Sequence, residues 1–134
     1  MKMYYVSHPF TGNEEKNRQE ARKITAELKK TYPNYIFINP LDVFTYAEDQ
    51  PYGEILKQCL ELLRECDGLI LTGYWFKSRG CTVERLEAIR YGLEISYMNN
   101  GHIKITKPLP PEAEAVVEAF RKFITDFYEK EGKK

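Results

Sequence analysis

Short apolar runs alternate along the chain with longer segments in which apolar residues recur every three to four positions. The short runs are typical of buried strands, and the recurrence at helical spacing predicts amphipathic helices. Strands are predicted at residues 3–6, 35–38, 68–72, 94–97 and 102–106. The run at 68–72 is the most apolar, so we expect it at the centre of a sheet, buried on both faces.

The segments between and after these strands have helical spacing. Helices are expected from residue 13 to the break at residues 32–34, and at residues 55–66, 82–93 and 113–127. Residues 41–51 follow the second strand and are predicted to form a long surface loop. Loops of this length inside a compact domain are often functional.

Strands that alternate with helices predict an α/β fold of the flavodoxin or Rossmann-like type. We expect a three-layer sandwich, with a mainly parallel sheet of four to five strands and helices on both faces. The strand order 2-1-3-4-5 suits the count, and the fifth strand can be a hairpin arm. Ligands of such sheets bind outside the carboxyl ends of the first and third strands, where the strand order reverses. The loop at 7–12 is therefore expected to face the segment at 73–84.

Composition adds limits to this picture. A chain of 134 residues with 43% apolar content fits a single domain at residues 1–134, with a frayed charged tail at 129–134. Twenty basic residues balance twenty acidic ones, which argues against a nucleic-acid-binding surface. No apolar run reaches the length of a membrane span and the first residues do not suggest a signal peptide, so we expect a cytoplasmic protein without a leader or a membrane partner. The three cysteines have neither disulfide nor zinc spacing, and no metal or cofactor is expected.

The segment at 73–84 carries the strongest chemical signal. Glu84 is predicted in or near the first turn of a helix, where free backbone N–H groups and the helix dipole favour its ionised form. An ionised carboxylate can attack a sugar carbon. The same helix end, with Ser78 and Gly80, can hold a phosphate or carboxylate. A glutamate at this place can equally do no more than stabilise its helix.

Two further residues near the predicted crevice leave their roles open. Trp75 lies in a run of three aromatic residues, which can stack on a base or pack as a lid or a dimer contact. His8 is the only histidine near the crevice, and a lone loop histidine can be incidental. The chain has no serine elbow, zinc-ligand set or phosphate-binding P-loop.

Several short motifs together resemble one family. Tyr5-x-Ser7-x-Pro9-x-Thr11-Gly12 resembles the Tyr-x-Ser-Gly-Pro-x-Thr-Gly start of small nucleoside 2-deoxyribosyltransferase-like proteins, many of them from phages and prophages. Asn39-Pro40, Cys66-Asp67 and Trp75-x-x-Ser78-x-Gly80-x-x-x-Glu84 continue the match in order. The likeness spans roughly residues 3–97. More distantly, the chain resembles the 2′-deoxynucleoside 5′-phosphate N-hydrolases.

The resemblance implies that Glu84 attacks C1′ of a nucleoside and forms a glycosyl-enzyme intermediate. It implies that Tyr5 orients this glutamate and that Ser78 contacts the ligand, at a 5′-phosphate in the hydrolases. The partner would be a small-molecule nucleoside or nucleotide, with a neighbouring subunit of a homodimer or higher homo-oligomer often completing the site. The residues expected to bind substrate are Ser7, His8, Pro9, Phe10, Gly12, Asn39, Trp75, Ser78 and Gly80.

One position departs from the family pattern. Cys59 stands where the family has an aspartate that assists the leaving base. Asp42 follows the second strand at the correct end of the sheet, so it is the better candidate for a relocated acid. His8 replaces the glycine of the first motif and could also supply a proton. Asp67 lies at the wrong end of the sheet.

Three functions remain open. The leading prediction is cleavage or transfer of an N-glycosidic bond in a (deoxy)nucleoside or its 5′-monophosphate, with Glu84 and Tyr5 as catalytic residues and Asp42 as the candidate acid. The alternative is a catalytically silent nucleotide-binding or sensing module, which Cys59 favours. A third interpretation follows from residues 80–84, which resemble the Gly-Gly-x-Gly-Thr-x-x-Glu loop of nucleoside-monophosphate phosphoribohydrolases without its glycine pair.

Overall fold

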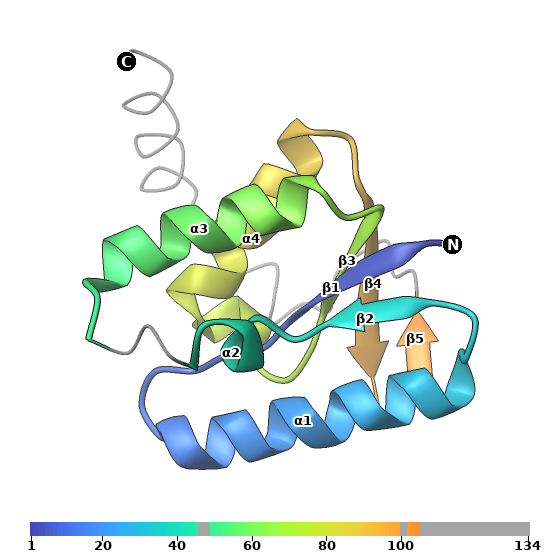
Figure 1. Ribbon diagram of the computed structural model, residues 1–134, viewed down its shortest axis with the longest axis horizontal. Helices are drawn as coiled ribbons and strands as arrows, with labels where there is room; N and C mark the ends of the chain where they lie inside the picture. The colour runs from blue at the N-terminus through green and yellow to red at the C-terminus, as the bar shows by residue number, and fades with distance from the viewer. Residues whose placement is uncertain (46–48, 100–101, 105–134) are drawn as a thin grey trace.

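A five-stranded sheet forms the centre of the protein, as the computed structural model shows for residues 1–45, 49–99 and 102–104 (Figure 1). Its strands are β1 (Met3–Ser7), β2 (Ile36–Ile38), β3 (Gly68–Leu71), β4 (Glu94–Asn99) and β5 (His102–Lys104). They lie in the order β2-β1-β3-β4-β5. All neighbouring pairs are parallel except β4 and β5, which are antiparallel. The predicted α/β class and the predicted strand order are confirmed.

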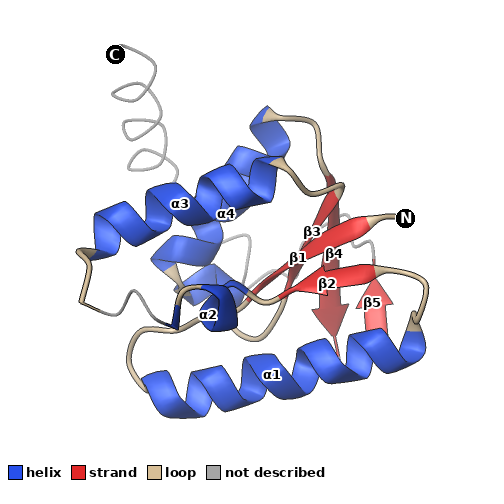
Figure 2. Ribbon diagram, viewed as in Figure 1, coloured by secondary structure: helices blue, strands red, loops and turns tan. Residues whose placement is uncertain are grey.

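Helices cover both faces of this sheet. They are α1 (Glu14–Thr31), α2 (Pro40–Val43), α3 (Tyr52–Arg64), the short 3-10 helix η2 (Trp75–Lys77) and α4 (Arg79–Arg90). Figure 2 shows α1 on one side of the sheet and α3 with α4 on the other, so the fold has three layers. Within the described part of the chain, no helix has the length and apolar character needed to cross a membrane. The helix predicted at 113–127 and the tail at 129–134 lie outside the described residues, so the single domain at 1–134 stays a prediction.

Strand β1 supplies both halves of the core because its side chains point alternately to opposite faces. Tyr5 packs in the larger apolar cluster, with residues of α3, α4 and β3. Its neighbours Tyr4 and Val6 pack in the smaller cluster, beside Leu28 of α1 and Ile70 of β3. The predicted central strand β3 is buried along its whole length. The sequence pattern therefore identified the centre of the sheet correctly.

Helix α3 begins at Tyr52, three residues earlier than predicted, and other local features also differ from the predictions. Part of the predicted loop at 41–51 is the helix α2, whose first residue is Pro40 and whose N-cap Asn39 accepts a hydrogen bond from the Leu41 N–H at 3.1 Å. Four residues are too few to show helical periodicity. Helix α4 begins at Arg79, three residues earlier than predicted, because the Ser78 hydroxyl caps it. Glu84 is consequently the sixth residue of this helix and lies in its second turn.

Candidate active site

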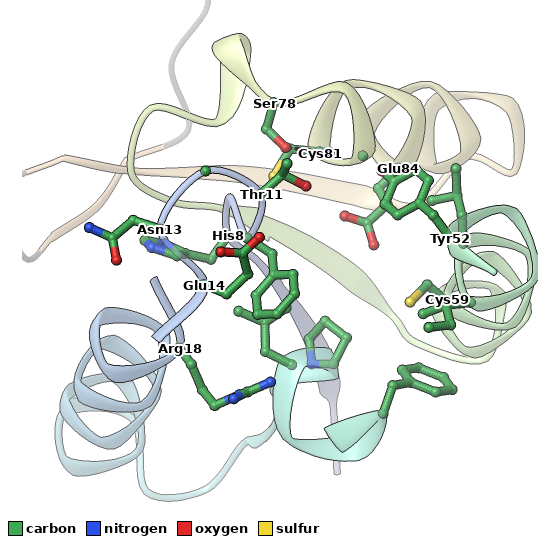
Figure 3. Close-up of a pocket in the computed structure, with 18 of the residues that line it drawn as sticks. His8, Thr11, Asn13, Glu14, Arg18, Tyr52, Cys59, Ser78, Cys81 and Glu84 are labelled. Carbon is green, nitrogen blue, oxygen red and sulfur yellow. Dashed lines mark hydrogen bonds between the residues drawn. The ribbon is translucent and has the colours of Figure 1, made fainter. Parts of the chain in front are cut away.

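A cavity of about 840 Å³ lies beyond the carboxyl end of β1 (Figure 3). Its walls come from the loop after β1, the N-terminal ends of α1, α3 and α4, and helix α2. This is the crevice that the reversal of strand order predicts. The volume falls within the range of small-molecule sites, roughly 300–1,000 Å³.

Glu84 projects from α4 into this cavity, and two residues of β1 hold its carboxyl group. The Tyr5 hydroxyl donates a hydrogen bond to Oε2 of Glu84, and the Ser7 hydroxyl donates to Oε1 at 2.8 Å. Tyr5 and Ser7 lie two positions apart on one strand, so their side chains point to the same face. Both carboxyl oxygens are therefore fixed by the same strand, β1, and only 7% of Glu84 is exposed.

The burial of Glu84 decides its charge state. Burial raises the pKa of this carboxyl group to about 7, although the hydrogen bonds from Tyr5 and Ser7 lower it. This corrects the expectation that the helix N-terminus would favour the ionised form. The dipole acts mainly within the first turn, and Glu84 lies in the second. Desolvation therefore dominates, and the group changes charge near neutral pH.

Cys59 and Tyr52, both from α3, surround the Glu84 carboxyl. The Cys59 thiol lies within hydrogen-bonding reach of the Tyr5 hydroxyl, and burial with the nearby Glu84 raises the thiol pKa to about 12. Burial, followed by Glu84, also raises the pKa of Tyr52 above its usual value. Both groups are therefore protonated at neutral pH. A thiol of this kind does not replace the carboxylic acid expected at position 59.

The Tyr52 hydroxyl lies directly over the start of α4. A methyl group placed on Gly80 would come within 2.9 Å of this oxygen, so the absence of a side chain at Gly80 makes room for Tyr52. Tyr52 lines the main cavity and also an adjoining cavity of about 770 Å³. It thus lies between the two spaces. Sequence reasoning missed Tyr52, because nothing near it in the chain shows that α3 begins beside α4.

Most residues expected to bind substrate do lie at the cavities. The main cavity is lined by Tyr5, His8, Phe10, Gly12, Ser78, Gly80 and Glu84. Pro9 lines the adjoining cavity, which shares His8, Thr11, Tyr52, Ser78 and Gly80 with the main one. Ser7 is fully buried behind Glu84 and acts through its hydrogen bond to that carboxyl.

Three expected site residues lie elsewhere among the described residues. Trp75 is buried in the core, where its ring packs against Phe76 and Tyr97. Asn39 caps helix α2, and Asp42 forms an ion pair with Arg22 of α1 at 2.7 Å. The structure therefore does not bring the proposed relocated acid, Asp42, to Glu84. Trp75 and Phe76 therefore serve packing in this fold, whereas Tyr74 is exposed and lines the adjoining cavity.

His8 joins the two facing loops. The Thr72 hydroxyl donates to the Ser7 carbonyl at 2.7 Å, so its oxygen accepts from the His8 Nδ1–H at 2.8 Å. The other ring nitrogen, Nε2, lies 3.3 Å from the Glu20 carboxylate. Burial lowers the pKa of His8, and Glu20 acts in the opposite direction. Gly73 has φ +62°, and a side chain there would clash with the His8 ring at 2.9 Å, so the predicted meeting of these loops is confirmed.

The first turns of α1 form the cavity wall opposite Glu84. Figure 3 shows the carboxylate of Glu14 and the guanidinium of Arg18 directed into the space from this side. The Arg18 guanidinium lies 5.3 Å from the centre of the Phe10 ring. Sequence reasoning missed this wall, since charged residues at the start of a helix are usually solvated. Among the described residues, no group of three or more His, Cys, Asp and Glu is arranged to hold a metal ion.

Comparison with known proteins gives a family and a fold. Residues 1–97 match the family described as "Domain of unknown function (DUF4406)", so the chain belongs to this family. No curated protein matches the chain. Among solved structures, the fold is similar to that of a 2-desoxiribosyltransferase from Leishmania mexicana, with a TM-score of 0.54 and 14% identity over 78% of this chain and 79% of the other. At this identity the likeness shows a shared fold.

Proposed function

We propose that the protein cleaves or transfers the N-glycosidic bond of a (deoxy)nucleoside or a nucleoside 5′-monophosphate, with Glu84 as the nucleophile. The observation that carries this proposal is the position of Glu84, a buried carboxyl group held by Tyr5 and Ser7 at the wall of the main cavity. The structural likeness to a 2-desoxiribosyltransferase supports it. A homodimer or higher homo-oligomer remains part of the proposal.

The reaction has two steps. A Glu84 oxygen first forms a bond to C1′ while the C1′–N bond breaks, and the electron pair leaves with the base, which takes up a proton. Water or a second base then attacks C1′, and the bond from C1′ to Glu84 breaks. Water gives hydrolysis, and a second base gives transfer. Tyr5 and Ser7 hold the carboxylate so that one oxygen faces the sugar throughout.

The proton for the departing base is the weak point of this site. Retaining glycosidases use two carboxyl groups about 5–5.5 Å apart, one as nucleophile and one as acid. Here Cys59 stands beside Glu84, and its pKa of about 12 makes it a poor proton donor. The protonated Tyr52 hydroxyl and water are the remaining donors at this end of the cavity. We therefore expect turnover to be slow.

A nucleotide-binding module without turnover is the second candidate. The observation that favours it is again Cys59, because the neighbourhood of Glu84 lacks the carboxylic acid that the leaving base needs. Such a module keeps the cavity and the ordered Glu84 but releases no base. Binding and turnover must therefore be measured on the same ligands.

An assay of base release and base exchange tests the proposal. The panel comprises ribo- and deoxynucleosides of each base and their 5′-monophosphates, with wild type, Glu84→Gln and Glu87→Gln. Glu87 is a matched control, since it is buried one turn further along α4 and pairs with Arg64 outside the cavity. We expect turnover with wild type and Glu87→Gln and none with Glu84→Gln. Ligand binding without turnover by wild type would establish the silent module instead.

A further inference from the structure

The cavity wall opposite Glu84 carries two side chains of opposite charge, Glu14 and Arg18. We infer that this wall binds the base of the ligand and that the base is guanine. Arg18 would donate to O6 and N7, and Glu14 would accept from N1–H and the 2-amino group. The inference rests on the proposed function, because Glu84 fixes where the sugar lies. It adds the identity of the base and the two residues that select it.

The direction of the base follows from the stereochemistry of the first step. A nucleophile displaces a leaving group from the opposite side of the reacting carbon. With Glu84 bonding to C1′, the departing base lies on the far side of C1′. Figure 3 shows Glu84, Tyr52 and Cys59 on one side of the cavity and Glu14 with Arg18 on the other. The base nitrogen bonded to C1′ therefore stays near the Glu84 end of the cavity, where a donor at position 52 or 59 can act, and the far edge of the base is directed toward the first turns of α1.

Glu14 and Arg18 are spaced to contact one base together. They are four residues apart on α1, so they lie on the same helix face with roughly 5–6 Å between their Cβ atoms. Arginine presents its donors as a rigid fork, and a carboxylate accepts two hydrogen bonds side by side. Phe10, whose ring lies 5.3 Å from the Arg18 guanidinium, adds an aromatic face on which a base can stack.

Guanine is the base whose edge matches this pair. Its O6 and N7 are adjacent acceptors, which arginine contacts in pairs more often than any other base edge. The neighbouring N1–H and 2-amino group are adjacent donors, which suit the Glu14 carboxylate. Adenine presents an amino donor where guanine has O6, and cytosine likewise has an amino donor at N4. A phosphate is disfavoured at this wall, because Arg18 Nη1 already pairs with Glu15 at 3.7 Å and Glu14 adds a second carboxylate beside this one cation.

The test measures binding separately from turnover. Isothermal titration of the Glu84→Gln protein with 2′-deoxyguanosine, deoxyadenosine, deoxycytidine, thymidine and deoxyinosine gives the base preference. We expect deoxyguanosine to bind tightest. Adding Glu14→Gln should reduce the affinity for deoxyguanosine roughly tenfold more than the affinity for deoxyadenosine. Deoxyinosine lacks the 2-amino group, so the same change should reduce the affinity for deoxyinosine less than it reduces the affinity for deoxyguanosine.

Two more variants complete the design. Arg18→Met is expected to weaken the binding of deoxyguanosine and of deoxyinosine alike, because both carry O6 and N7. Arg22→Met is the control on the same helix, since Arg22 pairs with Asp42 outside the cavity, and it should leave the base preference unchanged. Glu14 is exposed, so its replacement leaves the core intact.

The outcomes separate this inference from the proposed function. Equal affinity for all the bases, or an equal loss of affinity for all of them in Glu14→Gln and Arg18→Met, would overturn the guanine assignment. Turnover by wild type would in that case still support the glycosidase proposal. If no nucleoside or 5′-monophosphate bound or was turned over, the proposed function itself would fail. A guanine preference that depends on Glu14 and Arg18 supports the inference even if no base is released.

Discussion

The Tyr5 hydroxyl donates a hydrogen bond to Glu84 across 79 positions of sequence, from the central region of the sheet to a helix packed on it. Ser7 adds a second donor from the same face of β1. Because rigid elements carry all three side chains, the fold itself orients the carboxyl group. A buried carboxyl with a pKa of about 7 at the wall of a cavity is the kind of group that active sites contain.

Turnover is expected to rise with pH until Glu84 is ionised. Below its pKa of about 7 the carboxyl is protonated and is a poor nucleophile, so kcat/KM should fall with decreasing pH and level off above the pKa. Ser7→Ala removes a donor that lowers this pKa, so the midpoint should move to higher pH. The measurement is the pH profile of base release from pH 5 to 9. A midpoint in Ser7→Ala at or below that of wild type would contradict the assigned role of Ser7.

Glu84 should also make stability depend on pH. Its pKa is raised in the folded protein from 4.5 to about 7, so its contribution to stability is complete below pH 4.5 and is lost as the pH rises to about 7. The shift corresponds to a loss on the order of 3 kcal/mol. Glutamine is neutral at every pH, so the stability advantage of Glu84→Gln over wild type should grow by that order between pH 5 and 8. Urea unfolding of both proteins measures it, and parallel pH profiles would show that Glu84 is not desolvated.

Gly80→Ala is expected to disturb the site through Tyr52. The added methyl group would meet the Tyr52 oxygen at 2.9 Å, and this flexible side-chain end can shift, so stability should change little while ligand affinity falls several-fold. In a Tyr52→Phe background the same change should have less effect, because the hydroxyl is gone. Gly53→Ala is the control, since nothing lies within 4 Å of its added carbon. Equal effects of Gly80→Ala in both backgrounds would exclude the Tyr52 contact as the cause.

Cys59→Asp tests whether the missing acid limits turnover. An aspartic acid beside Glu84 can protonate the leaving base, and positioned acids contribute roughly 10²–10⁴-fold to such reactions. We expect base release to accelerate at least about tenfold, with some loss of stability from a second buried carboxyl. Cys59→Ser is the matched control, since its hydroxyl is a poor acid at neutral pH. If aspartate and serine gave the same rate, proton donation at position 59 would not limit the reaction.

Sequence patterns predicted the fold because it depends mainly on hydrophobic periodicity. Strand β1 alternates between the two faces of the sheet, β3 is buried throughout, and their order follows from the α/β rules. The meeting of the two loops followed from that order. The positions of Tyr5 and Glu84 at one cavity could likewise be anticipated from the motifs, whereas Ser7 was expected to bind substrate and instead lies behind Glu84 and donates to it.

The remaining features of the site depend on packing between distant segments. A tryptophan at position 75 is compatible with stacking on a ligand and with filling the core. Only the contact between Trp75 and Tyr97 in the folded protein distinguishes these two roles. Tyr52 and Arg18 reach the cavity because α3 and α1 begin beside it, which no local pattern shows. The start of α4 was predictable in principle, since Ser78 is a common N-cap residue. With that start, the carboxyl of Glu84 would have been placed in the second turn.

The central claim is that Glu84 bonds covalently to the sugar. Intact-protein mass spectrometry after rapid mixing with the deoxynucleosides and their 5′-monophosphates, followed by peptide mapping, tests it directly. The predicted result is one deoxyribosyl adduct, or its 5′-phosphate, located on Glu84 in wild type and in Cys59→Asp and absent from Glu84→Gln. Base release by Glu84→Gln at the wild-type rate, or release by wild type without any adduct on Glu84 under single-turnover conditions, would contradict the claim.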